Sequence, residues 1–534
     1  MDFRNRFRLE SLGIFLIALL LFTLGIWDEQ PQGFDGRWAL FLQEMFRHGA
    51  SLFPTTYGQP YADYPGTATF FSFVFARLFG APNHLANILP TALASAGVVA
   101  LIYRLLVPSS RPWALLTVLL TLLTTQLLEK SRSVCLDQMV ALLCVGSFYL
   151  LHSGERLGSR LRQLAVFPLF ILGFAIRGPL GLIEVCGVVC VYWALGKPGE
   201  RVKQVLIHGI VGLVLLAGCW WLLVKLARLS GGDAFADDVF RMQVGGRLDE
   251  TGEPFYFYFQ LSLYRYFPVV PLALVTLVAL RQRLFQGGNA DSQLVVRLGA
   301  CGLMILLGLS VPHFKRAYYI LPMVPMFAAV AAYGLLQAQG WLVGVRRGYE
   351  WLVAALPALC VVAIFVCRHG WQKHGYWPEV SLPALIGVLL VLQVAALLAW
   401  RRTGRLVLLS LFALAAQWLV LVSVVEPAKD LQFDTRNFVR QVEALRVSQP
   451  GPLVFLNLGK DTWAVRYMMN LDHDEQPLFI SAAQVERLDS LPRPSWVIVA
   501  RKETELLQGT PLEHLAPSFQ GRLNDNPLMV FLLQ

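Results

Sequence analysis

Three aspartates lie where their neighbours are aromatic, glycine-rich or apolar. Asp35 lies in the segment 27–38, at the predicted start of a helix, and Asp63 lies among tyrosines and prolines. Asp137 lies about one turn inside an apolar stretch. A carboxylate can remove a proton or orient a hydroxyl, and within a membrane it is costly, so it indicates function. The alternatives are a helix N-cap for Asp35, a turn for Asp63 and a structural ion pair for Asp137, with Arg132 as its candidate partner.

Several cations lie on the same predicted side of the molecule as these acids. Arg177 lies in a turn between two apolar stretches, Lys315 and Arg316 lie in a second turn, and Arg247 lies in a longer polar segment. One cation at a membrane surface is weak evidence, because Arg and Lys side chains commonly extend to the interface. Their convergence predicts a bound anion, most simply a phosphate.

Long apolar stretches must position these side chains. Hydrophobic residues make up 56% of the 534-residue chain and charged residues 15%, whereas soluble domains carry about 25% charged residues. Because a crossing needs about 20 residues, the pattern predicts a polytopic α-helical membrane protein with about thirteen spans. The shorter segment 67–80 predicts an interfacial helix. The predicted spans are 11–27, 85–106, 112–128, 134–152, 163–177, 179–196, 205–228, 262–280, 293–311, 317–338, 351–367, 382–400 and 405–425.

The basic clusters predict the orientation of these spans. If the spans alternate as counted, the clusters all fall on one side, which the positive-inside rule makes cytoplasmic. The loops 28–66 and 229–261 and the C-terminal segment fall on the other side. The net charge of +10 is therefore a topology signal, and no nucleic-acid partner is expected. The clusters contain Arg4, Arg6, Arg8, Arg104, Arg111, Arg156, Arg160, Arg162, Lys197, Arg201, Lys203, Arg281, Arg283, Arg346, Arg347, Arg401, Arg402 and Arg405.

The segment 427–534 differs from the rest, because short apolar runs typical of strands alternate there with helical patterns. This predicts a small exterior α/β domain, after a membrane domain over 1–426. The segment has no glycine-rich phosphate loop and no spacing typical of a catalytic triad, so no chemistry is predicted for it. The eight cysteines fall in or beside apolar segments, which favours core packing over metal binding.

Four short motifs resemble those of the GT-C membrane glycosyltransferases, in the branch that contains protein O-mannosyltransferases and lipid A aminoarabinose transferases. Residues 35–38 (Asp-Gly-Arg-Trp) are similar to the family's Asp-Glu-x-Arg-Tyr, and residues 58–65 are similar to its Gly-x-Pro-Tyr-x-Glu-Lys-Pro. Residues 177–179 are similar to Lys-Gly-Pro, and residues 315–322 to the Lys-x-x-x-Tyr-x-Leu-Pro turn. The likeness covers nearly the whole chain.

The motifs also depart from the family pattern. Only Asp35 precedes Arg37, at a spacing one residue shorter, although residues 28–29 offer another acidic pair. Tyr64 stands where the family has Lys, and the segment 229–261 lacks the histidine that can help to bind a metal. A divalent metal ion therefore stays an open alternative, with Asp63 as its only candidate ligand.

The resemblance implies transfer of a sugar from a polyprenyl-phosphate donor to a lipid, glycan or protein acceptor in the cell envelope. It implies a monomer in a bacterial inner membrane, with the active site facing the periplasm. Asp35 is the implied catalytic carboxylate, and Arg177, Lys315, Arg316 and Arg247 are the implied ligands of the donor phosphate. The residues implied to line or orient the cavity are Arg37, Asp63, Tyr64, Arg132, Asp137 and Tyr319.

Two other functions fit parts of the sequence. A flippase or transporter for lipid-linked sugars would more often show internal repeats and charges deep within the spans, and neither is clear here. A structural assembly protein that docks through the C-terminal domain would explain that domain but not the first exterior loop.

Overall fold

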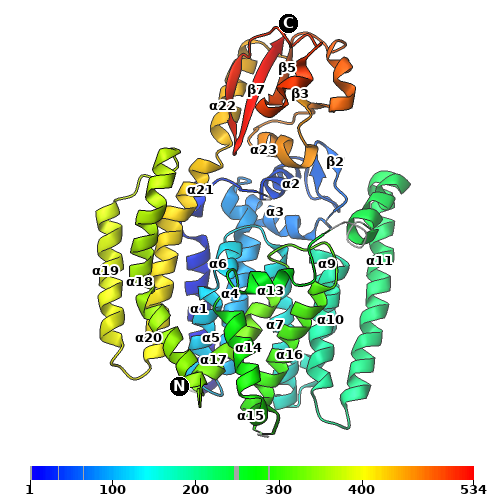
Figure 1. Ribbon diagram of the computed structural model, residues 1–534. Helices are drawn as coiled ribbons and strands as arrows, with labels where there is room; N and C mark the ends of the chain where they lie inside the picture. The colour runs from blue at the N-terminus through cyan, green and yellow to red at the C-terminus, as the bar shows by residue number, and fades with distance from the viewer. Residues whose placement is uncertain (1–2, 34, 64, 246–251, 287–288) are drawn as a thin grey trace.

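The computed structural model describes residues 3–33, 35–63, 65–245, 252–286 and 289–534. A bundle of long helices carries a small domain at one end (Figure 1). The N-terminus lies at the opposite end of the bundle, at the bottom of the view, and the chain ends in the small domain at the top. The helical bundle and the small C-terminal domain therefore meet at the upper end of the helices.

The bundle has a helix at each of the thirteen predicted positions. Among the described residues, seven helices are long and apolar enough to cross a membrane, or eight if the pair α5 and α6, bent by 75°, counts as one span. The polytopic helical architecture is confirmed, but the count of thirteen is not, because the helices 179–194, 269–279 and 321–336 are shorter than a full crossing. The bundle helices are α1 (Phe3–Thr23), α4 (His84–Leu106), α5 (Arg111–Leu123), α6 (Thr125–Ser131), α7 (Leu136–Leu157), α8 (Arg160–Leu164), α9 (Val166–Arg177), α10 (Pro179–Ala194), α11 (Arg201–Phe240), α13 (Phe257–Ser262), α14 (Val269–Ala279), α16 (Ala290–Ser310), η3 (Leu321–Met323), α17 (Val324–Leu336), α18 (Leu342–Lys373), α19 (Leu382–Ala399) and α20 (Arg405–Val420).

Basic loops gather at the N-terminal end of the bundle. Glu10 near the start of α1 accepts a hydrogen bond from Tyr103 at 2.6 Å and lies 3.2 Å from Arg111, so three chain segments meet there. The short helix α15 (Arg281–Gln286) lies at the same end (Figure 1). This placement agrees with the predicted alternation of the loops.

Residues 35–63 and 65–79 fold into α2 (Asp35–His48), a hairpin of β1 (Thr55–Thr56) and β2 (Gln59–Pro60), and α3 (Thr67–Phe79). The buried Glu44 carboxylate accepts the backbone N–H groups of Tyr57 at 2.6 Å and Gly58 at 3.3 Å. This contact fixes the hairpin against α2. The segment predicted as an interfacial helix is helical, and α3 packs against α2 and α4.

The C-terminal domain contains a five-stranded mixed sheet in the order β4-β3-β5-β7-β6. β3 pairs in parallel with β4 and β5, whereas β7 pairs antiparallel with β5 and β6. The predicted α/β domain is therefore confirmed as a mixed-sheet domain, and its division from the bundle at residues 426 and 427 stays a prediction. Its elements are α22 (Arg436–Ser448), β3 (Leu453–Leu456), α23 (Val465–Met468), β4 (Leu478–Ile480), β5 (Ser495–Ala500), β6 (Phe519–Leu523) and β7 (Asn526–Leu533), joined to α20 through η4 (Leu421–Val425) and α21 (Glu426–Gln432).

The C-terminal domain shares a hydrophobic core with α2 and the β1–β2 hairpin. Ala39, Leu40 and Tyr57 are buried in the same cluster as Tyr467 and Met469 of the domain. Burial of this apolar surface holds the domain against α2. The domain therefore helps to enclose the space above the bundle.

Candidate active site

A cavity of about 780 Å³ lies between the upper end of the bundle and the C-terminal domain. The segments around α2, the end of α6, the turn before η3 and helix α21 each contribute to its wall. The C-terminal domain contributes a further part of the wall. The lining residues fall in the segments 29–38, 61–63, 129–135, 314–319, 421–433, 461–466 and 524–525, together with His84 and Met242.

Asp35 is the first residue of α2 and lines this cavity. Its side chain is buried, and one carboxylate oxygen accepts the backbone N–H of Val134 at 3.2 Å. Among the described residues its carboxylate makes no hydrogen bond to α2 itself, which argues against the N-cap alternative. Burial raises the pKa of Asp35 from 3.8 to about 6, although the Lys130 ammonium opposes this shift. A carboxylate with this pKa is suited to accept a proton near neutral pH.

Lys130, Arg316 and Arg37 are three of the cations that line the same cavity as Asp35. Lys130 lies over the ring of Tyr318 at 5.5 Å, and its ammonium forms no ion pair with any described residue. Arg316 lies over the ring of Phe314 at 4.9 Å. Arg37 donates to the backbone carbonyl of Asp461 at 3.1 Å. The cavity therefore offers positive charge close to a buried carboxylate.

Two predicted phosphate ligands lie outside the cavity lining. Arg177 is buried and pairs with Asp137, with Nε and Oδ1 3.3 Å apart. Asp137 thus pairs with Arg177, whereas the sequence suggested Arg132. The Arg177 guanidinium also lies 4.8 Å from the ring centroid of Tyr319, which lines the cavity. Lys315 is buried and donates to the carbonyl of Glu253 at 2.8 Å, so contact of either cation with a donor phosphate stays a prediction.

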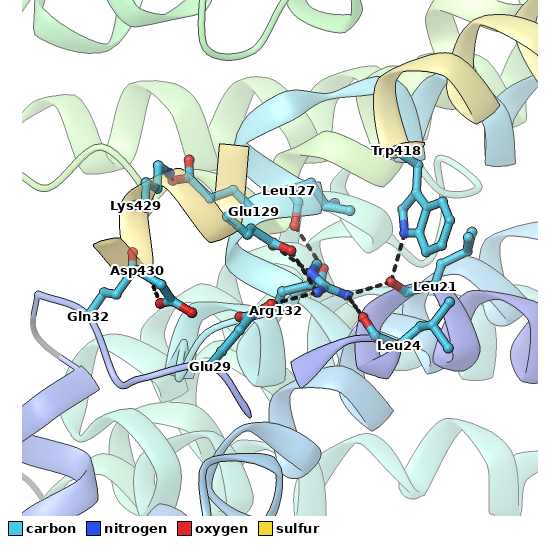
Figure 2. Close-up of polar contacts among 12 residues, drawn as sticks. Leu21, Leu24, Glu29, Gln32, Leu127, Glu129, Arg132, Trp418, Lys429 and Asp430 are labelled. Atoms are coloured by element: carbon cyan, nitrogen blue, oxygen red, sulfur yellow. Dashed lines mark hydrogen bonds and ion pairs between the residues drawn. The ribbon is translucent and has the colours of Figure 1, made fainter. Parts of the chain in front are cut away.

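Arg132 forms a buried clamp between α1 and α21. Its guanidinium donates to both oxygens of Glu426, at 2.6 and 2.7 Å, and to Glu29 at 3.2 Å. It also donates to the carbonyls of Leu21 and Leu24, both at 2.9 Å (Figure 2). These bonds satisfy a charge whose side chain is only 1% exposed. Arg132 therefore holds the floor of the cavity together and has little capacity left for a ligand.

Two further carboxyl groups near this clamp have raised pKa values. Burial, followed by the negative charge of Glu426, raises the pKa of Glu29 to about 8. Burial also raises the pKa of Asp430 to about 6, while its oxygen accepts a hydrogen bond from Gln32 at 2.7 Å (Figure 2). At neutral pH Glu29 therefore retains its proton.

Two of the predicted site residues, Arg247 and Tyr64, lie outside the described residues. Asp63 lines the cavity, and its backbone carbonyl accepts a hydrogen bond from the Gln243 side chain. Within the described ranges, no group of three or more His, Cys, Asp or Glu residues is placed to hold a metal ion. Binding of a metal ion by Asp63 therefore stays a prediction.

Sequence reasoning missed several residues that the structure brings to the cavity. Lys130 lies two residues before Arg132 in the same turn, so the signal that singled out Arg132 also applied to Lys130. Asp461, Trp463 and Arg466 come from the C-terminal domain, for which no chemistry was predicted. They carry no recognisable motif, and only the docking of the domain reveals them.

Comparisons with known proteins agree with this arrangement. Residues 63–223 match the family described as dolichyl-phosphate-mannose-protein mannosyltransferase. The crystal structure of ArnT from Cupriavidus metallidurans bound to undecaprenyl phosphate has a TM-score of 0.72 to this chain at 15% identity, covering 97% of each chain. This chain has the GT-C glycosyltransferase fold.

Other solved structures support this GT-C assignment. ArnT from the same organism in the apo state has a TM-score of 0.72 at 13% identity, again covering 97% of each chain. The oligosaccharyltransferase of Archaeoglobus fulgidus with a tethered acceptor peptide has a TM-score of 0.50 at 10% identity, covering 92% of this chain and 69% of that one. No curated protein matches in sequence. The predicted resemblance and the predicted enzyme class, a polyprenyl-phosphate-sugar glycosyltransferase, are confirmed at the level of the family.

Proposed function

We propose that this protein transfers a sugar from a polyprenyl-phosphate donor to the hydroxyl group of an acceptor, at the side of the membrane where the C-terminal domain lies. The observation that carries this proposal is Asp35, a buried carboxylate with a pKa of about 6 that lines a cavity at the end of the bundle. The family match and the fold supply the class of donor.

The reaction needs a base and a stabilised leaving group. The acceptor oxygen attacks the anomeric carbon of the donor sugar, and the bond from that carbon to the phosphate oxygen breaks. The acceptor proton passes to Asp35, and the bonding electrons leave with the polyprenyl phosphate. Since Asp35 is ionised above a pH of about 6, it can act as this base near neutral pH.

Lys130 and Arg316 are the cations that we assign to the leaving phosphate. Both line the same cavity as Asp35, and the positive charge of Lys130 opposes the rise in the pKa of that carboxyl. Cations fixed where negative charge develops are usually a large catalytic term. Because no ion pair with a described residue neutralises Lys130, its charge is available to the phosphate.

The Arg177–Asp137 pair acts behind this site as a positioning element. Both side chains are 2% exposed, and the Arg177 guanidinium packs on Tyr319, which lines the cavity. The pair therefore holds the wall of the cavity from within the bundle.

The arrangement of charge supports a site that faces away from the cytoplasm. The basic loops gather at the N-terminal end of the bundle, and the cavity lies at the other end. With basic loops in the cytoplasm, the cavity would face the periplasm of a bacterial inner membrane. A lipid carrier then supplies the sugar where nucleotide donors are absent.

The release of polyprenyl phosphate tests this function, because every donor of this class leaves the same lipid. Membranes that contain the wild-type protein should convert endogenous lipid-linked sugar to polyprenyl phosphate, as measured by mass spectrometry. Asp35→Asn should accumulate in the membrane to the same level and release at least about 100-fold less. Release by this variant at the wild-type rate would contradict the assignment of Asp35 as the base.

A further inference from the structure

The C-terminal domain forms one wall of the cavity with five polar or aromatic side chains. Asp461, Trp463 and Arg466 lie just after strand β3, and Asn524 and Asp525 lie in the turn between β6 and β7. β3 and β5 are parallel neighbours, and open α/β sheets commonly bind ligands beyond the carboxyl ends of parallel strands. The domain thus turns this end of its sheet toward the cavity.

This wall is fixed to the helix turn that carries Asp35. A Cβ atom on Gly36 would lie only 3.0 Å from the sulfur of Met469, so glycine permits the close approach of α2 and α23. Arg37 donates to the carbonyl of Asp461 at 3.1 Å, and the Tyr57 hydroxyl donates to the carbonyl of Lys460 at 2.6 Å. Direct contacts therefore join the wall to the segment that carries the candidate base.

The wall presents an aromatic face beside side chains that are free to bind a ligand. The guanidinium carbon of Arg466 lies 4.4 Å from the Trp463 ring centroid, and the guanidinium makes no hydrogen bond or ion pair within the described ranges. The carboxylate of Asp461 likewise has no described partner, while Asn524 donates its side-chain N–H to Asp525 at 2.5 Å. These groups offer both donors and acceptors of hydrogen bonds.

The balance of charge on the wall distinguishes between classes of acceptor. The wall carries one cation, Arg466, and two anions, Asp461 and Asp525, so it has no excess positive charge that would favour a phosphate. A peptide acceptor would commonly add to a strand edge, and neither edge strand, β4 nor β6, lines the cavity. A sugar ring has an apolar C–H face that can stack on an aromatic ring and a rim of hydroxyls that needs mixed donors and acceptors.

We infer that this wall is the acceptor subsite and that it takes the ring of an uncharged glycan, stacked on Trp463 and hydrogen-bonded by Arg466, Asp461 and Asn524. The assignment of the bound glycan as the acceptor rests on the proposed function. The binding site itself rests only on the residues above.

Glycan binding can be measured without turnover. The full-length protein in nanodiscs is applied to an array that displays neutral oligosaccharides beside a phosphorylated glucosamine disaccharide. Binding of undecaprenyl phosphate to the same samples is measured separately. The variants are Trp463→Ala and Arg466→Ala, with Trp463→Phe to retain an aromatic ring and Arg487→Ala as the matched control, because Arg487 is exposed elsewhere on the same domain.

Neutral glycans should bind the wild-type protein, and Trp463→Ala and Arg466→Ala should each weaken that binding by about 10-fold or more. Trp463→Phe should retain most of the binding of neutral glycans, and Arg487→Ala should leave that binding unchanged. The affinity for undecaprenyl phosphate should not change in any variant. Preference for the phosphorylated disaccharide, absence of neutral-glycan binding, or equal binding by Trp463→Ala would each overturn the inference. An inactive enzyme that still binds glycan through Trp463 would overturn the proposed function alone.

Discussion

Replacing Asp35 by asparagine should remove activity and at the same time stabilise the protein. The pKa of Asp35 rises from 3.8 to about 6 on burial, and about 2 pKa units correspond to about 3 kcal/mol. Because the folded state holds the proton more tightly than the unfolded chain, this stability is fully present below a pH of about 4 and is lost as the pH rises through about 6. Asp35→Asn escapes that loss, so its advantage at pH 8 should reach at most about 3 kcal/mol, with water in the cavity reducing it.

Two measurements on purified protein in detergent check this reasoning. The apparent unfolding midpoint, followed by intrinsic fluorescence at a fixed heating rate, should rise by a few degrees in Asp35→Asn at pH 8 and be unchanged at pH 4. Wild-type transfer activity should fall about 10-fold between pH 7 and pH 5, as the base becomes protonated. The control is Asp489→Asn, since Asp489 is an exposed carboxyl of the C-terminal domain.

The outcome that would refute this reasoning is an Asp35→Asn variant that is inactive and also less stable than the wild type at pH 8. Such a result would make Asp35 a structural residue at the start of α2. Wild-type activity that does not vary between pH 5 and pH 8 would equally remove its role as a base.

Other perturbations test the surroundings of the site. Arg132→Met leaves the buried Glu426 carboxylate without its cation and should cost about 3–5 kcal/mol, seen as reduced thermal stability in detergent; an unchanged midpoint would contradict the clamp. Because the pKa of Glu29 is raised from 4.5 to about 8, wild-type stability should decline as the pH rises from about 5 to about 8 and level off above it, and Glu29→Gln should abolish that decline. Lys130→Met should weaken binding of undecaprenyl phosphate about 10-fold, measured by thermophoresis, and equal affinity would exclude a phosphate contact. Gly36→Leu should push Met469 away from α2 and lower turnover while the fold, monitored by circular dichroism, is retained; normal turnover would show that the close approach is dispensable.

The sequence by itself determined the class of architecture and the end of the bundle at which Asp35 lies. Crossing helices need long apolar runs, and the orientation of the loops follows local clusters of Arg and Lys. Both features therefore depend on residues that are consecutive in the sequence. Asp35 could be singled out for the same reason, since it begins a helix within an aromatic segment. The number of crossings was less well determined, because several apolar helices are shorter than a full span.

The tertiary structure alone decided which charges meet. Arg132 pairs with Glu426, 294 residues away in the chain, and Arg177 rather than Arg132 pairs with Asp137. Such pairs leave no periodic signal in the sequence, because their energy depends on burial and on distances between separate elements. The same reason explains why Trp463 and Arg466 were missed: they reach the cavity only because burial of apolar surface docks the C-terminal domain on α2.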